Sequence, residues 1–327
     1  MKEPAPDFDI VRTAHVEFRV TDLERSRDFY VNTLGLVETE STRNRIYLRG
    51  LEDRCHHSLI LTEANESAVD HISFRLRNES GLDEVAELLG KLDLPFKWIE
   101  AESEERGQGR ALRTQDPLGF PVEFFCEMRE VEWLWQKFDK HQGARIMRID
   151  HVNMLVPEVQ KASDWYTAKL GFQCTEYTET KDKDPKLWAT WLKRKPTVHD
   201  VALMSGIGPR LHHAGFYVAD RHSILDAADL LAAKGYVKSI ERGPGRHGIS
   251  NAFFLYLRDP DGHRVELYTG DYLSADPDWK PIRWKLGDPQ RQTFWGAPAP
   301  ESWFSEASKV LSVFTGEKMK TRKPILG

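Results

Sequence analysis

Two histidines and a glutamate in the second half of the chain, His151, His213 and Glu266, have the residue types of a metal site. Two neutral imidazoles and one carboxylate form the facial triad that suits non-haem Fe(II), because they leave coordination positions open for a substrate and for dioxygen. A single histidine near the start of a strand is more often an ordinary packing residue. The three together favour a metal centre.

The segment from Gly245 to Glu266 adds further chemical groups. It contains His247, an apolar strand with Tyr256, the turn Asp259-Pro260-Asp261-Gly262, and a second strand that carries Glu266. Such a hairpin is often only a hairpin. Here it could place an acid, a hydrogen-bond donor and a metal ligand together.

A repeat in the sequence predicts the elements that hold these residues. Four segments, headed by His15, His71, His151 and His213, show the period-two pattern of a half-buried strand. Helical patterns follow at residues 23–34, 84–89, 159–170 and 224–231, each succeeded by short strand-like runs. The sequence therefore predicts a β-α-β-β-β module written four times.

Larger spacings indicate that the modules come in pairs. The distance from His15 to Gly35 equals that from His151 to Gly171, and two Asp-Pro turns each precede a glutamate, Glu123 or Glu266, by the same interval. We therefore expect an α+β fold of two open-barrel domains, 1–140 and 141–270. A short helix over residues 133–142 would join them, and a tail, 271–327, would cover the active site.

Composition excludes several classes of protein. The chain has 327 residues, 40% of them hydrophobic, and a net charge of −5 without a long basic run, so we expect no nucleic-acid partner. No apolar stretch is as long as a membrane span, and the start lacks the apolar core of a secretory signal, which predicts a cytoplasmic protein. Cys55, Cys126 and Cys174 show no CxxC spacing, which argues against disulfides or a thiolate zinc site.

On these motifs the chain resembles the extradiol ring-cleaving dioxygenases of the vicinal-oxygen-chelate superfamily. The segment from Gly245 to Glu266 matches that family's signature in its histidine, its tyrosine and its final glutamate. The resemblance implies a glyoxalase-like fold and His151, His213 and Glu266 as ligands of Fe(II), or alternatively of Mn(II). It also implies dioxygen as co-substrate and a homotetramer.

The resemblance further implies roles around the metal. His199, which precedes His213 by fourteen residues, would move protons, and Tyr256 would donate a hydrogen bond to a substrate oxygen. The expected substrate-binding residues are Asn153, Trp191, Arg242, His247 and Arg291. The implied reaction is cleavage between ring carbons 2 and 3 of a catechol with an anionic side chain, above all 3,4-dihydroxyphenylacetate. The resemblance implies a pair of adjacent arginines in enzymes for this substrate, whereas this chain has Gln292 next to Arg291.

The first half repeats the ligand types in His15, His71 and Glu123, but its surroundings differ. Arg113 takes the place of Tyr256, and residues 100–105 are acidic where residues 241–247 are basic. An anionic catecholate would be repelled there, so we expect this half to be catalytically vestigial. Two other functions remain open, a glyoxalase-like metal isomerase and a non-catalytic binding protein for small aromatics.

Overall fold

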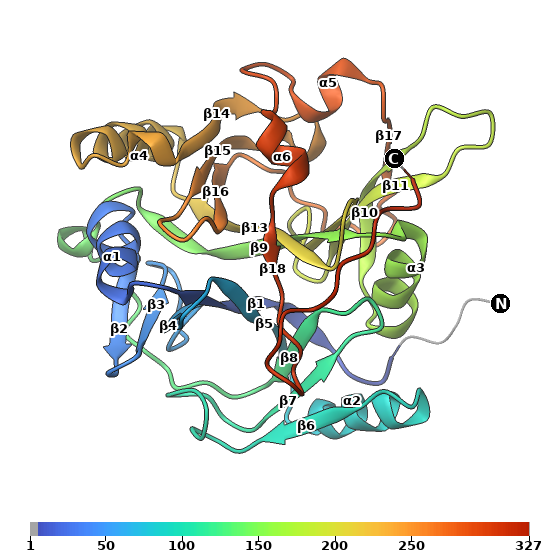
Figure 1. Cartoon of the computed structure of the whole chain (residues 1–327), viewed down its shortest axis with the longest axis horizontal. Helices are drawn as coiled ribbons and strands as arrows, with labels where there is room; N and C mark the ends of the chain where they lie inside the picture. The colour runs from blue at the N-terminus through green and yellow to red at the C-terminus, as the bar shows by residue number, and fades with distance from the viewer. Residues whose placement is uncertain (1–5, 327) are drawn as a thin grey trace.

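The computed structural model describes residues 6–326, which form four consecutive βαβββ modules and a tail (Figure 1). The first module comprises β1 (Ile10–Val20), α1 (Leu23–Arg27) continued by the π-helical η1 (Asp28–Thr33), β2 (Val37–Ser41), β3 (Arg45–Arg49) and β4 (Leu59–Glu63). The second comprises β5 (Ala68–Leu76), α2 (Ser80–Lys91), β6 (Phe96–Ile99), β7 (Ala111–Gln115) and β8 (Pro121–Phe125).

The second pair of modules follows a linker with one 3-10 turn, η2 (Phe138–Lys140). The third module comprises β9 (Ile146–Val156), α3 (Val159–Asp164) with the π-helical η3 (Trp165–Lys169), β10 (Gln173–Glu179), β11 (Leu187–Lys193) and β12 (Val201–Ser205). The fourth comprises β13 (Arg210–Val218), α4 (Arg221–Ala233), η4 (Val237–Ser239), β14 (Ile240–Arg246), η5 (Ile249–Asn251), β15 (Phe253–Arg258) and β16 (Arg264–Thr269). The tail holds β17 (Ile282–Lys285), α5 (Pro289–Gln292), α6 (Glu301–Ser305) and β18 (Ser308–Lys309).

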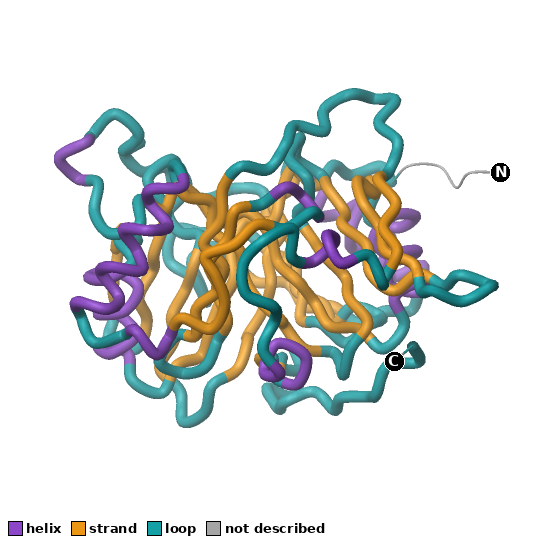
Figure 2. The backbone as a smooth tube through the Cα atoms, turned by 90° about the horizontal axis from the view of Figure 1, so that it is seen from above, coloured by secondary structure: helices purple, strands orange, loops and turns teal. Residues whose placement is uncertain are grey.

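The modules pair into two sheets, which confirms the expected α+β fold. The first sheet has the order β2-β3-β4-β1-β5-β8-β7-β6, and the second has the order β14-β15-β16-β13-β9-β12-β11-β10-β17. In each sheet the leading strands of the two modules, β1 with β5 and β9 with β13, run antiparallel at the centre. The first sheet occupies the lower part of Figure 1 and the second the upper part, while Figure 2 shows the strands gathered between peripheral helices.

Local sequence signals explain where most helices begin and end. The Asp22 side chain accepts the backbone N–H of Arg25 at 2.9 Å, which caps α1, and Gly35 closes the helical segment with a φ of +85°. The apolar periodicity at residues 84–89 and 224–231 correctly predicts helices α2 and α4, but both helices begin earlier and end later than the periodic segments. The first three residues of α4 are polar and α2 opens with Ser80 and Gly81, so these positions add little to the apolar periodicity.

The helix predicted over residues 133–142 is wrong, since only the single turn η2 forms there. Trp133 and Phe138 are 47% and 75% exposed, so a helix in this linker would bury little apolar surface beyond that of Leu134. Segments shorter than about 12 residues are rarely helical in water without such packing.

The two sheets share one hydrophobic core and interlock through matched contacts. The hydroxyl of Tyr30 on η1 donates to Asp259 at 2.9 Å, and that of Tyr166 on η3 donates to Asp116 at 3.5 Å. In both cases a helical turn under one sheet reaches the Asp-Pro turn of the other sheet. Burial raises the pKa of both carboxyl groups, that of Asp116 to about 7.

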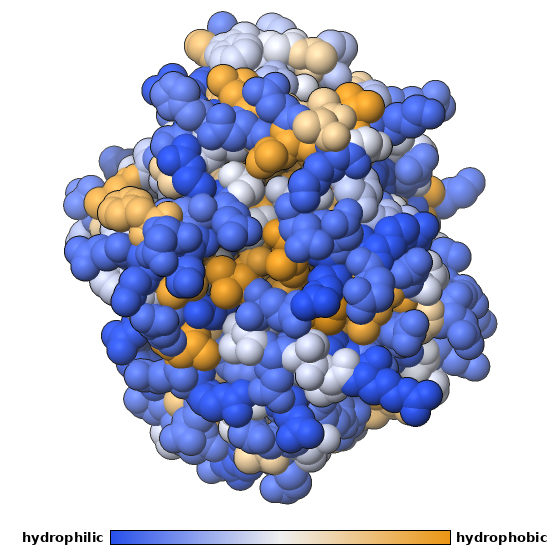
Figure 3. All heavy atoms as spheres, turned by 90° about the vertical axis from the view of Figure 1, so that its left-hand side faces the viewer, coloured by the Kyte–Doolittle hydropathy of each residue, from blue (hydrophilic) through white to orange (hydrophobic). Residues whose placement is uncertain are grey.

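The tail also spans both sheets, because β18 pairs with β13 and Val310 bridges to Val69 on β5. The face at the left of Figure 1 is largely hydrophilic, with apolar side chains in small groups (Figure 3). Within residues 6–326, none of the helices combines the length and apolar character needed to cross a bilayer.

Candidate active site

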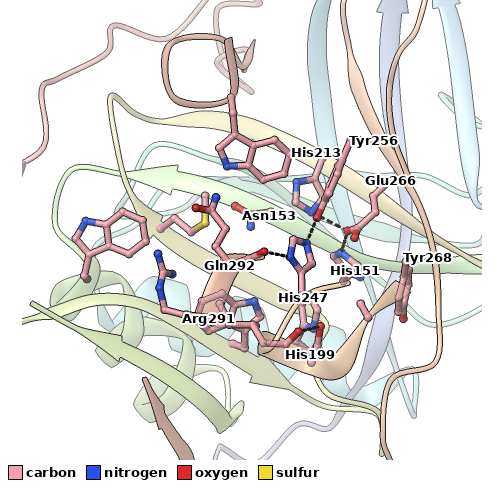
Figure 4. A pocket seen from close by; sticks show the side chains of 17 residues that line it. His151, Asn153, His199, His213, His247, Tyr256, Glu266, Tyr268, Arg291 and Gln292 are labelled. Carbon is pink, nitrogen blue, oxygen red and sulfur yellow. Dashed lines mark hydrogen bonds and ion pairs between the residues drawn. The ribbon is translucent and has the colours of Figure 1, made fainter. Parts of the chain in front are cut away.

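Three neighbouring strands of the second sheet bring His151, His213 and Glu266 together (Figure 4). The sequence pattern placed both histidines at the start of a strand, but they lie inside β9 and β13. Gly215 on β13 pairs with His151 on one side and with Glu266 on β16 on the other. Glu266 Oε2 therefore lies 3.0 Å from His151 Nε2 and 3.2 Å from His213 Nε2.

Gly215 provides the space that the His151 imidazole occupies. A Cβ atom at this position would lie 2.2 Å from Cε1 and 2.4 Å from Nε2 of His151. Carbon atoms in contact stay about 3.5 Å apart, so any side chain here would displace the ring. The glycine is needed for close approach.

A chain of hydrogen bonds fixes the tautomer of His213. The carbonyl of Trp303 can only accept, so His212 Nε2, which lies 3.0 Å from it, must donate. The pKa of His212 is held well below its usual value, first by burial, and a neutral His212 leaves its Nδ1 as an acceptor. His213 Nδ1, 2.7 Å away, therefore donates, and the lone pair of His213 Nε2 faces Glu266.

His151 contacts two carboxylates, since its Nδ1 lies 3.2 Å from Asp150 and its Nε2 lies 3.0 Å from Glu266. Against the effect of burial, these contacts raise the pKa of His151 to about 9. A divalent ion can take the place of the proton on Nε2, and outer carboxylates such as Asp150 commonly orient metal-bound histidines in this way.

The donor set therefore fits a divalent ion. The ligand atoms of His151, His213 and Glu266 lie within 4.8 Å of one another, and all three residues are buried. Burial alone would raise the pKa of Glu266, but the neighbouring His151 and His213 outweigh it and hold that pKa well below normal. A buried ionised carboxylate with two imidazoles suits Fe(II) or Mn(II).

His199 lies against this triad, in a loop rather than on a strand. It precedes β12 in the loop that follows β11, and its ring centroid is 4.0 Å from that of His151. Burial, reinforced by the neighbouring His151, holds the pKa of His199 well below its usual value. A neutral imidazole in this position can accept a proton.

Tyr256 and His247 form a hydrogen-bonded pair on the opposite side of the triad (Figure 4). His247 Nδ1 donates to the carbonyl of Gln292, and its Nε2, 3.0 Å from the hydroxyl of Tyr256, accepts. Burial, and then the charge of Arg242, lowers the pKa of His247 to about 3. His247 is thus neutral with both nitrogens engaged, so it offers no positive charge to a substrate carboxylate.

The two predicted arginines occupy different places. Arg291 lines the cavity, with its guanidinium 5.1 Å from the ring of Trp188 and its buried Nε without a hydrogen-bond partner. Arg242 is not among the lining residues. Its guanidinium lies between the rings of Phe254 and Trp303, and it donates to Thr293 at 2.7 Å.

The cavity at the triad measures about 540 Å³, open solvent included, and brings together most of the predicted residues. Asn153, Trp191, His199, His247, Tyr256 and Arg291 line it with the three ligands. The lining residues that the sequence did not indicate are Trp188, Met204, Ile249, Ser250, Ala252, Tyr268, Gln292 and Trp303. Gln292 and Trp303 belong to the tail, which has no counterpart in the first half of the sequence and so could not be aligned with a repeated segment. In a regular strand Trp188 and Trp191 would point to opposite faces of β11, so the sequence pattern that places Trp191 in the cavity does not also place Trp188 there.

Known proteins share this architecture. Residues 12–124 and 148–267 match the Glyoxalase/Bleomycin resistance protein/Dioxygenase superfamily. A manganese-dependent 2,3-dihydroxybiphenyl 1,2-dioxygenase of Geobacillus genomosp. 3 is 35% identical over 89% of this chain and 95% of its own length. A metapyrocatechase of Geobacillus stearothermophilus is 32% identical over 93% of this chain and 95% of its own.

Solved structures agree. A homoprotocatechuate 2,3-dioxygenase from Brevibacterium fuscum, in complex with 3,4-dihydroxyphenylacetate, superposes with a TM-score of 0.93 at 42% identity and covers 98% of both chains. The homologous enzyme from Arthrobacter globiformis gives a TM-score of 0.92 at 42% identity, again over 98% of both chains. The chain therefore belongs to the Glyoxalase/Bleomycin resistance protein/Dioxygenase superfamily, and within it to the extradiol ring-cleaving catechol dioxygenases.

Proposed function

We propose that the protein cleaves a catechol with an anionic side chain, with 3,4-dihydroxyphenylacetate as the preferred substrate, between ring carbons 2 and 3. The choice of substrate rests on the environment of Arg291. Its guanidinium is buried on the wall of the triad cavity, and its Nε has no protein partner. An unpaired buried cation favours a ligand with a carboxylate, which a guanidinium can bind through two hydrogen bonds. The likeness to enzymes named for this substrate supports the same choice.

The proposed reaction breaks one ring bond and places both atoms of dioxygen in a 2-hydroxymuconate semialdehyde derivative, so it needs no external reductant. When bound by His151, His213 and Glu266, the Fe(II) or Mn(II) ion supplies a redox-active centre that catechol and dioxygen can share. His199 would take a proton from the catechol and return it later, since it is neutral and buried beside His151.

Tyr256 would stabilise charge on a substrate oxygen. Burial, and then the charge of Glu266, raises the pKa of Tyr256 well above normal, so its hydroxyl stays protonated. With a substrate bound, this hydroxyl would donate to the substrate oxygen instead of to His247. Asn153 and Trp191 would position the ring, since both line the cavity and Asn153 Oδ1 has no hydrogen-bond partner. Arg242, behind Trp303, would act by holding the tail at Gln292 and Thr293.

We further propose that residues 141–270 form the catalytic domain, that residues 1–140 take no part in catalysis, and that the tail, 271–327, covers the site. The arrangement of Arg291, Gln292 and Trp303 around the cavity supports this division. The homotetramer expected for the family is a further prediction, which light scattering on the purified protein would test.

A second candidate substrate is a catechol with an aromatic substituent. Trp188, Trp191 and Ile249 give one wall of the cavity an apolar, aromatic surface. A relative named for 2,3-dihydroxybiphenyl shares 35% identity with this chain. Such a substrate would bury apolar area on this wall but would leave Arg291 without a carboxylate partner.

The test is turnover by protein loaded anaerobically with Fe(II) or Mn(II) and then supplied with oxygen. We expect yellow product and oxygen uptake with 3,4-dihydroxyphenylacetate, at a kcat/KM roughly 10- to 100-fold above that for unsubstituted catechol, as one charged hydrogen-bonded contact provides. Faster turnover of 2,3-dihydroxybiphenyl would shift the assignment to the second candidate. A colourless mixture that consumes no oxygen with any catechol would refute ring cleavage.

A further inference from the structure

The first sheet contains a second buried group of metal-type ligands. His15 on β1, His71 on β5 and Glu123 on β8 occupy the strand positions that His151, His213 and Glu266 occupy in the second sheet, and Glu105 joins them from the loop before β7. The four side chains are completely buried, and their ligand atoms lie within 4.8 Å of one another.

The geometry of the two imidazole pairs is nearly the same. The ring centroids of His15 and His71 are 5.3 Å apart with an interplanar angle of 89°, and those of His151 and His213 are 5.4 Å apart at 82°. In the first sheet the two Nε2 atoms are 3.1 Å apart, and each lies 3.2 Å from an oxygen of Glu105. Ligands held about 2.0–2.1 Å from a tetrahedral zinc ion are roughly 3.4 Å apart, so these separations suit a shared ion.

Protonation alone does not satisfy this cluster. If both imidazoles carried a proton on Nε2, the two N–H groups would point at each other across 3.1 Å. A single proton can be shared between the two Nε2 atoms, but it then leaves the contacts of these atoms with Glu105 without a proton. A cation placed among the four ligand atoms removes both conflicts.

An independent sign comes from His57. His56 and His57 link Glu40 to Glu105 through three contacts of 3.2, 3.0 and 3.3 Å, but two neutral imidazoles carry only two N–H groups. The unsatisfied contact lies at the inner end, where the buried His57 Nε2 and Glu105 Oε2 have no hydrogen-bond partner. When the two N–H groups serve the outer contacts, His57 Nε2 and Glu105 Oε2 present lone pairs to each other beside the cluster.

Arg113 makes the site closed rather than catalytic. It stands opposite Glu123, where Tyr256 stands opposite Glu266, and it binds an oxygen of Glu105 and, at 2.6 Å, Oε2 of Glu123. Oε1 of Glu123 faces the histidines and also accepts hydrogen bonds from Ser73 and Gln108. Oε1 of Glu105 faces both Arg113 and His71, and its Oε2 faces His15. A neighbouring hollow, lined in part by Arg19, Arg45, Asp70 and Arg113, has no aromatic wall for a catechol.

We propose that His15, His71, Glu105 and Glu123 bind a structural divalent ion, and that Zn²⁺ is the ion that fits. Two imidazoles and two carboxylates complete a four-coordinate site without an open position, as structural zinc requires. Zinc also binds nitrogen and oxygen donors more tightly than manganese or iron(II) does.

The experiment is metal analysis by mass spectrometry of protein produced with both iron and zinc and freed of loosely bound metal. Wild-type protein should contain one zinc in addition to the iron or manganese of the second sheet. Glu266→Gln should lose the iron or manganese and keep the zinc, whereas Glu123→Gln should do the reverse. Glu176→Gln, another buried glutamate replaced by its isostere, is the matched control and should keep both metals.

Wild-type and Glu266→Gln proteins that both lack the extra zinc would overturn the proposal, whatever their activity with catechols. Should Glu123→Gln fail to fold, wild-type crystals decide the question. Anomalous scattering at the zinc edge should give a peak between His15 and His71, and its absence from crystals grown with zinc would refute the site.

Discussion

Replacing Gly215 with alanine tests the metal site with the smallest possible change. The new Cβ would lie 2.2 Å from Cε1 of His151, whereas contacting carbon atoms need about 3.5 Å. The required shift is therefore about 1 Å. The backbone of β13 is held between β9 and β16, so the imidazole must move rather than the strand. Gly215 has no left-handed φ, so alanine adds no backbone strain.

A displacement of about 1 Å in a catalytic group commonly costs about 100-fold in rate, and functional sites tolerate only about 0.5 Å. We expect Gly215→Ala to reduce kcat/KM by about 100-fold and to lower the iron or manganese content, while the far-ultraviolet circular dichroism spectrum stays native. Gly90→Ala is the matched control. No atom lies within 4 Å of a Cβ there, and alanine inside α2 should leave activity unchanged and add about 0.5–1 kcal/mol of stability.

Full metal content and full kcat/KM in Gly215→Ala would contradict this reasoning. The ring of His151 would then not depend on the space above Gly215, and its assignment as a metal ligand from this geometry would have to be withdrawn. A protein that fails to fold would be recognised from its spectrum and would not count as support.

Three further substitutions separate the roles of other residues. His199→Phe should lower kcat by roughly 10²- to 10⁴-fold and leave the metal content unchanged, and loss of metal would show that the role is misassigned. Arg291→Gln should reduce the preference for 3,4-dihydroxyphenylacetate over unsubstituted catechol by about 10-fold or more, through KM; an unchanged preference would exclude Arg291 as the carboxylate receptor. Glu241, whose pKa is lowered to about 2 by Arg264 against the opposing effect of burial, should stabilise the fold by about 1–3 kcal/mol above pH 4.5. The stability difference between wild type and Glu241→Gln in urea unfolding should therefore shrink as the pH falls from 4.5 toward 2, and a constant difference would argue against this linkage.

The repeat and the metal ligands could be predicted from the sequence because both depend on local patterns. His151 precedes Gly171 by the same interval as His15 precedes Gly35, and Glu266 follows its Asp-Pro turn by the same interval as Glu123 follows the turn in the first half. Alternation then indicates which strand face the ligands share. The helix over residues 133–142 failed because most of its apolar residues have nothing to pack against, Leu134 excepted. Exposure of Phe138 shows this only in the folded chain.

The rest of the site could not be predicted because it depends on backbone groups and on the tail. The carbonyl of Trp303 fixes the tautomer of His212, and the carbonyl of Gln292 holds His247. Every residue has a carbonyl, so the sequence carries no sign of these contacts. The basic segment 241–247 likewise suggested a substrate contact for Arg242, whereas packing places its guanidinium behind Trp303.

The reciprocal contacts of Tyr30 with Asp259 and of Tyr166 with Asp116 limit how this protein can be recombined with its relatives. A chimaera that joins the N-terminal half of one enzyme to the C-terminal half of another must keep a compatible tyrosine and aspartate at both contacts between the sheets. Otherwise the buried carboxyl group of Asp259 or Asp116 would lose the hydrogen bond that a tyrosine hydroxyl normally donates to it. Either half produced alone would also expose the apolar surface of the shared core and a carboxyl group without its tyrosine partner. We would expect such a half to aggregate.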